Sequence, residues 1–174
     1  MRWIWLVALF SQVGSATWIV PQSVETKAQQ SQLVVRGKVM SHFKDTQGFW
    51  ALRFHVDEIL KDSLKTKPRT LVIRTHQRDF VWKGQRVLER VVGSPLLPTN
   101  TEFVVFLNSG AERPGVYGLS QLQEGVYRVM QDGVGRKRVL PLKAGSPSDE
   151  MPLSLASDEG PELLDSFLNR VRSP

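Results

Sequence analysis

Residues 49–60 read Phe-Trp-Ala-Leu-Arg-Phe-His-Val-Asp-Glu-Ile-Leu, and this stretch decides the fold class. Apolar and polar residues alternate along it, as expected for a β-strand with one face turned to a core. The face predicted to be buried carries Trp50, Leu52, Phe54 and Val56. After Asp57 the alternation shifts, which predicts a β-bulge or a bend. A long bent strand of this kind is typical of a small barrel, where one strand turns a corner.

Further strand-like segments lie on both sides of this stretch, separated by turn signals. The predicted strands are 33–40, 49–60, 70–76, 102–108, 115–120, 125–130 and 136–142. Residues 41–48 are expected to form a hairpin loop, and residues 77–100 a long irregular loop, a feature that is often functional in a compact domain. The sequence therefore predicts a mostly β fold, a small antiparallel barrel of five to seven strands in residues 33–142.

The two ends of the chain carry different signals. Arg2, the apolar run 3–10 and the small residues Gly14 and Ala16 predict a signal peptide over residues 1–16. Residues 17–32 read as a polar lead-in, and residues 143–152 as a linker rich in Ser, Pro and Gly. The tail 153–174 is predicted to hold an amphipathic helix over 161–172. Its apolar stripe consists of Leu163, Leu164, Phe167, Leu168 and Val171, and we expect this stripe to dock on the barrel.

The chain of 174 residues contains no cysteine and carries a net charge of +6. Without cysteine there is no disulfide framework, no thiolate ligand, no cysteine nucleophile and no lipid anchor on an N-terminal cysteine. We predict an exported protein, periplasmic or secreted, with no transmembrane segment after the signal is removed. The charge is uneven, because residues 17–148 hold 20 cationic and 11 anionic side chains whereas residues 149–174 hold two and six.

Cationic residues gather on the predicted outward faces of the first three strands. The candidate binding surface comprises Arg36, Lys38, Arg53, His55, Arg74 and His76, together with Trp82 of the long loop. This surface has two interpretations. One is an electrostatic docking surface for an anionic partner. The other is a solvated face that keeps the barrel from pairing at its edges. Trp82 is expected either to form a lid over the barrel end or to stand exposed as an anchor for a partner.

Motifs of the common enzyme classes are missing from the sequence. It has no nucleophile elbow, no Walker loop, no His-Glu-x-x-His and no calcium loop. We therefore predict no catalytic residue, no cofactor and no metal.

Two weaker alternatives stay open. One is a metal held by His55 and His76 with Asp57 or Asp79, and the other is an unrecognised hydrolase built on His76, Asp79 and Glu89.

A family resemblance emerges from the order of several short motifs. The matching segments are Leu33–Val39, Phe54–Lys61, Thr70–Ile73, Gly93-Ser94-Pro95, Phe106-Leu107, Gly118–Gln121 and Tyr127–Val129. In this order they resemble the netrin-like, or tissue-inhibitor-of-metalloproteinase-like, domains and their bacterial secreted relatives. The resemblance implies an OB-like barrel. It does not carry over the inhibitory mechanism, because the animal inhibitors chelate zinc with an N-terminal cysteine and the expected mature chain starts at Thr17.

These observations favour a binding protein over an enzyme. We predict an exported non-catalytic binding module, an accessory or inhibitor-like partner of another envelope or secreted protein. The alternative is a binder of an anionic polymer, a surface polysaccharide or nucleic acid, through the basic strand face. Nucleic acid is the less favoured polymer, because the predicted face offers no aromatic side chain for base stacking.

Overall fold

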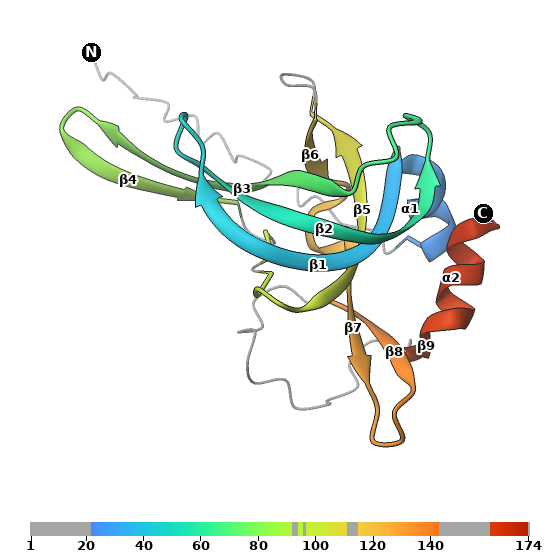
Figure 1. The fold of residues 1–174 in the computed structure, drawn as a ribbon. Coiled ribbons are helices and arrows are strands. Elements are labelled where there is room, and N and C mark those ends of the chain that lie inside the picture. The colour runs from blue at the N-terminus through green and yellow to red at the C-terminus, as the bar shows by residue number, and fades with distance from the viewer. Residues whose placement is uncertain (1–21, 92–93, 96, 111–114, 143–160, 174) are drawn as a thin grey trace, which may run out of the picture.

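The computed structural model describes residues 22–91, 94–95, 97–110, 115–142 and 161–173 (Figure 1). The predicted signal peptide 1–16 and linker 143–152 lie outside the described residues. The elements in chain order are α1 (Val24–Gln30), β1 (Leu33–Lys44), β2 (Phe49–Asp62), β3 (Thr70–Trp82), β4 (Gln85–Arg90), β5 (Glu102–Ser109), β6 (Val116–Leu119), the 3-10 turn η1 (Leu122–Gly125), β7 (Val126–Gln131), β8 (Lys137–Pro141), β9 (Glu162–Leu163) and α2 (Leu164–Arg172). The fold is mostly β, as predicted, and it ends in a helix.

Five strands close into a ring. β1 pairs with β2, β2 with β3, β3 with β6, β6 with β5, and β5 returns to β1. Four of these pairings are antiparallel, but β3 and β6 run parallel. The expectation of an antiparallel sheet is wrong at this one pair. The chain runs through β4 and β5 before it comes back to β3, and β6 then runs beside β3 in the same direction.

The described part of the chain holds nine strands rather than five to seven. The two that the sequence did not predict are β4 and β9. β4 reads QRVLER and contributes no residue to either core, so its apolar pattern is too weak to recognise. β9 has two residues and is held by its ladder to β8. Both strands depend on pairing with a neighbour and not on burial.

The long bent strand β2 has the irregularity predicted after Asp57. Arg36 of β1 lies opposite Glu58, and the next residue, Gly37, lies opposite Val56, so Asp57 is left without a partner in β1. An extra residue in one strand bends it and increases its twist. This bulge lets β2 curve around the ring.

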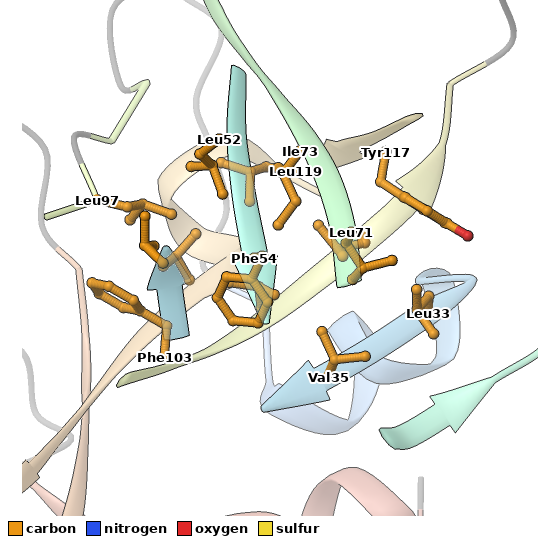
Figure 2. Packing of buried hydrophobic residues seen from close by; sticks show 14 residues of the cluster. Leu33, Val35, Leu52, Phe54, Leu71, Ile73, Leu97, Phe103, Tyr117 and Leu119 are labelled. Carbon is orange, nitrogen blue, oxygen red and sulfur yellow. The ribbon is translucent and has the colours of Figure 1, made fainter. Parts of the chain in front are cut away.

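The main core fills the inside of this ring. Its buried side chains come from β1, β2, β3, β5, β6 and β7, and Leu97 joins them from the segment before β5. In Figure 2 Phe54, Leu71 and Val35 point toward one another from three different strands. Of the four residues predicted to face inward, Leu52 and Phe54 are fully buried here and Val56 packs against them. The prediction is wrong for Trp50, which is only half-buried and does not belong to this core.

A second core lies outside the ring, beneath the two helices. Phe167 of α2 packs on Tyr127, with 4.7 Å between ring centroids, and Val34 and Phe106 lie in the same cluster. Docking of the C-terminal helix is therefore confirmed. The helix begins at Leu164 and not at residue 161, because residues 162 and 163 pair with β8. Leu163 is consequently 42% exposed and does not belong to the buried stripe.

Part of the predicted polar lead-in is also a helix. Ser23 caps α1, since its Oγ accepts a hydrogen bond from the backbone N–H of Thr26 at 3.2 Å. Val24, Lys27 and Ala28 are buried at the spacing of one helical face. Lys27 interrupts the apolar pattern, which is why composition alone did not reveal this helix.

Both predicted loops are shorter than expected. β1 continues through residues 41–44, and the turn is only 45–48, closed by the Asp45 carboxylate, which accepts hydrogen bonds from the amides of Gln47 and Phe49 at 2.9 Å each. The predicted loop 77–100 begins with a hairpin of β3 and β4. Its turn consists of Lys83 (φ 49°) and Gly84 (φ 78°), both left-handed, as in a two-residue type I′ turn.

Candidate binding surface

The outer face of β2 and β3 carries four of the predicted surface residues. Arg53 lies opposite Val72, and Arg74 opposite Ala51, so the two arginines occupy neighbouring strands on one face. Lys38 of β1 lies opposite His55, which extends this face by one strand. His76 lies farther along β3, six residues from the position opposite His55, which is about 20 Å. The two histidines are therefore not neighbours.

Acidic side chains neutralise part of this face. Arg36 pairs with Glu58 at 3.1 Å and with Glu102 at 3.5 Å. Arg74 donates a hydrogen bond to the Asp45 carboxylate at 2.7 Å. Lys38 and Arg53, in contrast, are exposed and have no ion-pair partner among the described residues. The basic face is therefore a mixed surface with a few available cations, and not a uniform positive patch.

Aromatic rings lie between these cations, which the sequence analysis did not predict. The guanidinium carbons of Arg74 and Arg78 lie 4.6 and 4.9 Å from the ring centroid of Phe49. Arg78 also lies 4.6 Å from the ring of Phe80, and Arg53 5.6 Å from the ring of Phe43. These are cation–π distances. The strand period of two explains the row, because Arg74, His76, Arg78, Phe80 and Trp82 alternate along β3.

The row is hard to recognise in the sequence because its second half lies in residues 77–82, which are predicted to belong to a loop. Once β3 extends to Trp82, its alternate residues must lie on one face. The alternation from residue 74 to residue 82 is visible in the sequence and is the signal that would have revealed the row.

The β3–β4 hairpin extends away from the ring, on the side opposite α2 (Figure 1). Its large apolar side chains are unusually accessible: Val81 is 72% exposed, Leu88 68% and Trp82 58%. The ammonium group of Lys83 lies 4.5 Å from the centre of the Trp82 ring. Trp82 is therefore at the tip of a hairpin and does not cover the end of the ring. Of the two predicted roles, the lid is wrong.

Asp79 lies at the base of this hairpin, between two cations. Arg86 donates to its carboxylate from Nε at 2.9 Å and from Nη2 at 2.5 Å, and Lys44 binds the same carboxylate. These hydrogen bonds, led by that from Arg86, hold the pKa of Asp79 well below its usual range. Its side chain is only 5% exposed. Asp79 thus joins β1, β3 and β4 through charge and has a structural role.

The structure does not bring together the residues of the alternative metal site or those of the alternative hydrolase site. Successive residues of a strand face opposite sides, so Asp79 and His76 lie on opposite faces of β3. The Asp57 carboxylate lies 3.6 Å from Nε2 of His55, far from His76. Within the described residues, no group of three or more histidine, aspartate or glutamate side chains is placed to hold a metal ion.

Within the described ranges, no helix combines the length and the apolar content needed to span a membrane. Comparison with known proteins finds no family model that matches the chain, and no match among curated proteins.

Proposed function

We propose that the protein is an exported, non-catalytic binding module that docks a partner protein through the β3–β4 hairpin. The observation that carries this proposal is the exposure of Val81, Trp82 and Leu88 on a hairpin that extends from the ring. Val81 and Leu88 lie on one face of the hairpin and Trp82 lies on the other, so a partner would enclose the hairpin from both faces. Large apolar side chains that stay exposed mark interaction sites.

The fold supports a scaffold role. We infer that the five-stranded ring is an OB-like barrel, in which one face and the adjoining loops serve for binding. The resemblance to netrin-like domains points in the same direction. Since the chain contains no cysteine, docking here would use side chains of the hairpin and not an N-terminal chelating group.

The side chains of the hairpin indicate the chemistry of the partner. Tryptophan and arginine are the residue types that most often dominate protein interfaces. Arg78, Lys83 and Arg86 surround the apolar side chains, while the neighbouring Asp79 is already neutralised. A partner that fits this hairpin has an apolar pocket with an acidic rim, which would also speed the encounter electrostatically.

The experiment captures proteins of the envelope fraction on the immobilised protein and then measures the affinity of the purified captured partner. We expect Trp82→Ala and Leu88→Ala each to weaken binding by tenfold or more, because hot-spot residues contribute about 2 kcal/mol or more. Their melting temperatures should stay unchanged, since both side chains are exposed. Val134→Ala is the matched control, because Val134 is 74% exposed at the tip of the β7–β8 turn.

The proposal fails if the captured partner binds both hairpin variants as tightly as the unchanged protein. It also fails if the Val134→Ala control loses as much affinity as they do. Retention of polymer in place of protein would instead favour the second candidate.

That second candidate is binding of an extended anionic polymer along β3. The row of cations and aromatic rings favours it, because stacking and charge together bind linear chains without sequence preference. Dextran sulfate and a single-stranded oligonucleotide are suitable probes. We expect affinity that falls steeply with salt and that weakens in Arg53→Gln and Arg78→Gln. Binding that does not respond to salt would exclude this candidate.

A further inference from the structure

One edge of strand β4 is open in the described part of the chain. Among the described strands, β4 pairs with β3 alone, and the hairpin that they form extends away from the ring (Figure 1). Arg86, Leu88 and Glu89 are exposed along β4. The strand has six residues and contains neither proline, which cannot donate to a ladder, nor glycine, which weakens a strand. Its backbone can therefore take up a further strand.

The hydrogen-bond pattern of the hairpin determines which backbone groups point to this open edge. Trp82 and Gln85 flank the two-residue turn, so they form a hydrogen-bonded pair. At the other end the backbone N–H of Val91 donates to the carbonyl oxygen of His76 at 3.1 Å. Hydrogen-bonded and non-hydrogen-bonded pairs alternate between these two ends. The residues whose N–H and C=O groups point away from β3, to the open edge, are therefore 86, 88 and 90.

The exposed apolar side chains lie on both sides of this edge. Val81 and Leu88 are on one face of the hairpin, and Trp82 is on the other. A partner that contacts both faces can do so by crossing the edge of β4. Its backbone then passes beside the N–H and C=O groups that β3 leaves unused.

We propose that the partner docks by adding an extended segment to the open edge of β4. This inference rests on the proposed docking through the β3–β4 hairpin and specifies how that docking is made. In strand addition the backbone hydrogen bonds provide affinity, and the side chains of alternate residues provide specificity.

The side chains of β4 define the segment that fits. Arg86 is 75% exposed although it binds Asp79, and it favours an acidic residue opposite it. Val87 and Leu88 favour apolar residues, and the exposed Glu89 favours a cationic one. For an antiparallel segment, the order from the N-terminus to the C-terminus is then cationic, apolar, apolar and acidic.

The test titrates the protein with a blocked synthetic peptide in which lysine, leucine, valine and glutamate follow one another between flanking threonines. Backbone amide resonances followed by NMR report the binding. We expect saturable binding, and we expect hydrogen exchange of the Leu88 amide to slow about tenfold or more, because this N–H gains an acceptor.

Two N-methylated copies of the peptide test whether its backbone makes the contact. In the antiparallel complex the N–H groups of the leucine and the glutamate face β4, so methylation of these two should abolish binding. The matched control is methylated on the lysine and the valine, whose N–H groups point away from β4. Its affinity should stay within about twofold of that of the unmodified peptide.

Leu88→Pro and Leu88→Ala separate backbone pairing from side-chain docking. Both substitutions remove the leucine side chain, but only proline removes the N–H that points to the open edge, and this N–H does not belong to the β3–β4 ladder. We expect the Leu88→Pro variant to bind the peptide about tenfold or more weakly than the Leu88→Ala variant. The methylated peptides keep the test decisive if proline disturbs the hairpin.

Strand addition is overturned by the absence of saturable binding, by equal affinities of the two methylated peptides, or by equal affinities of the two Leu88 variants. Docking through the hairpin is judged separately, by the affinity of the Trp82→Ala variant for the captured partner. A loss of affinity in Trp82→Ala together with equal affinities of the two methylated peptides would leave docking in place and remove strand addition alone.

Discussion

Gly37 lies in β1 at the bulge of β2, where no side chain fits. A Cβ atom added there would lie 1.9 Å from the carbonyl oxygen of His55 and 2.8 Å from Cε1 of Phe54. Both distances are far shorter than van der Waals contact, and the first partner is backbone. We expect Gly37→Ala to destabilise the protein by about 3 kcal/mol or more, by forcing the two strands apart. Denaturant unfolding measures this change.

Gly118 of β6 provides the control for that prediction. An added Cβ at Gly118 meets nothing within 4 Å, so Gly118→Ala should change the free energy of unfolding by less than about 0.5 kcal/mol. Equal losses of unfolding free energy in both variants would show that the close approach of the strands at Gly37 does not cause the destabilisation.

Among the elements, α2 provides the clearest case of burial. Phe167 is 2% exposed and packs on Tyr127, whereas Leu163, another member of the predicted stripe, is 42% exposed. Phe167→Ala should cost about 3–5 kcal/mol of unfolding free energy, because it opens a cavity under the helix. Leu163→Ala should cost well under about 1 kcal/mol. Thermal melting of the two variants side by side checks this difference, and similar losses would contradict it.

The two helices are also joined by charge. Arg170 of α2 donates from Nε to Glu25 of α1 at 2.5 Å and from Nη1 to Glu162 at 3.0 Å. The hydrogen bond from Arg170 is the main cause that lowers the pKa of Glu25 from 4.5 to about 2. A carboxylate with a lowered pKa adds stability above its unfolded pKa, and this stability is lost as the pH falls toward the folded value.

Glu25→Gln should therefore lower the melting temperature at neutral pH and have little effect at about pH 2. The side chain of Glu25 is 35% exposed, so solvent screening limits the effect to about 1 kcal/mol. Melting curves over this pH range test the prediction. Glu89→Gln serves as control, since Glu89 is exposed on β4 and has no ion pair among the described residues. A deficit that persisted unchanged to low pH would rule out this linkage.

At the scale of the whole molecule, the two cores share their strands. Leu33 and Val35 of β1 face the inside of the ring, while Val34 between them faces the helices, and β5 is divided in the same way. Neither core can lose its packing without moving the strands that hold the other. We expect one cooperative transition for the described domain.

Phe54→Ala in the inner core and Phe167→Ala in the outer core should each shift that single transition. Far-UV circular dichroism and tryptophan fluorescence should report the same midpoint within each variant. Two separate transitions in the Phe167 variant would show instead that the helices form an independent unit.

The sequence predicted β1, β2 and β3 from their alternating faces, β5 from its continuous apolar run, and α2 from its strongly apolar stripe. It did not predict β4, whose side chains are mostly exposed, or α1, whose inner face includes Lys27. The same limit applies to the candidate surface. Alternation places Arg36 and Arg74 on outward faces, but their neutralising partners, Glu58 and Asp45, depend on strand register, which no local pattern specifies.

The sequence by itself determined the mostly β fold, the bulge after Asp57 and the basic character of the outer strands. These features follow from alternation and composition, which act over a few residues. Only the tertiary structure decided that Trp82 stands at a hairpin tip and that Asp79 is buried between Lys44 and Arg86. Those outcomes depend on pairing between strands, since Lys44 and Asp79, which are 35 residues apart in the chain, meet only when the sheet fixes its register.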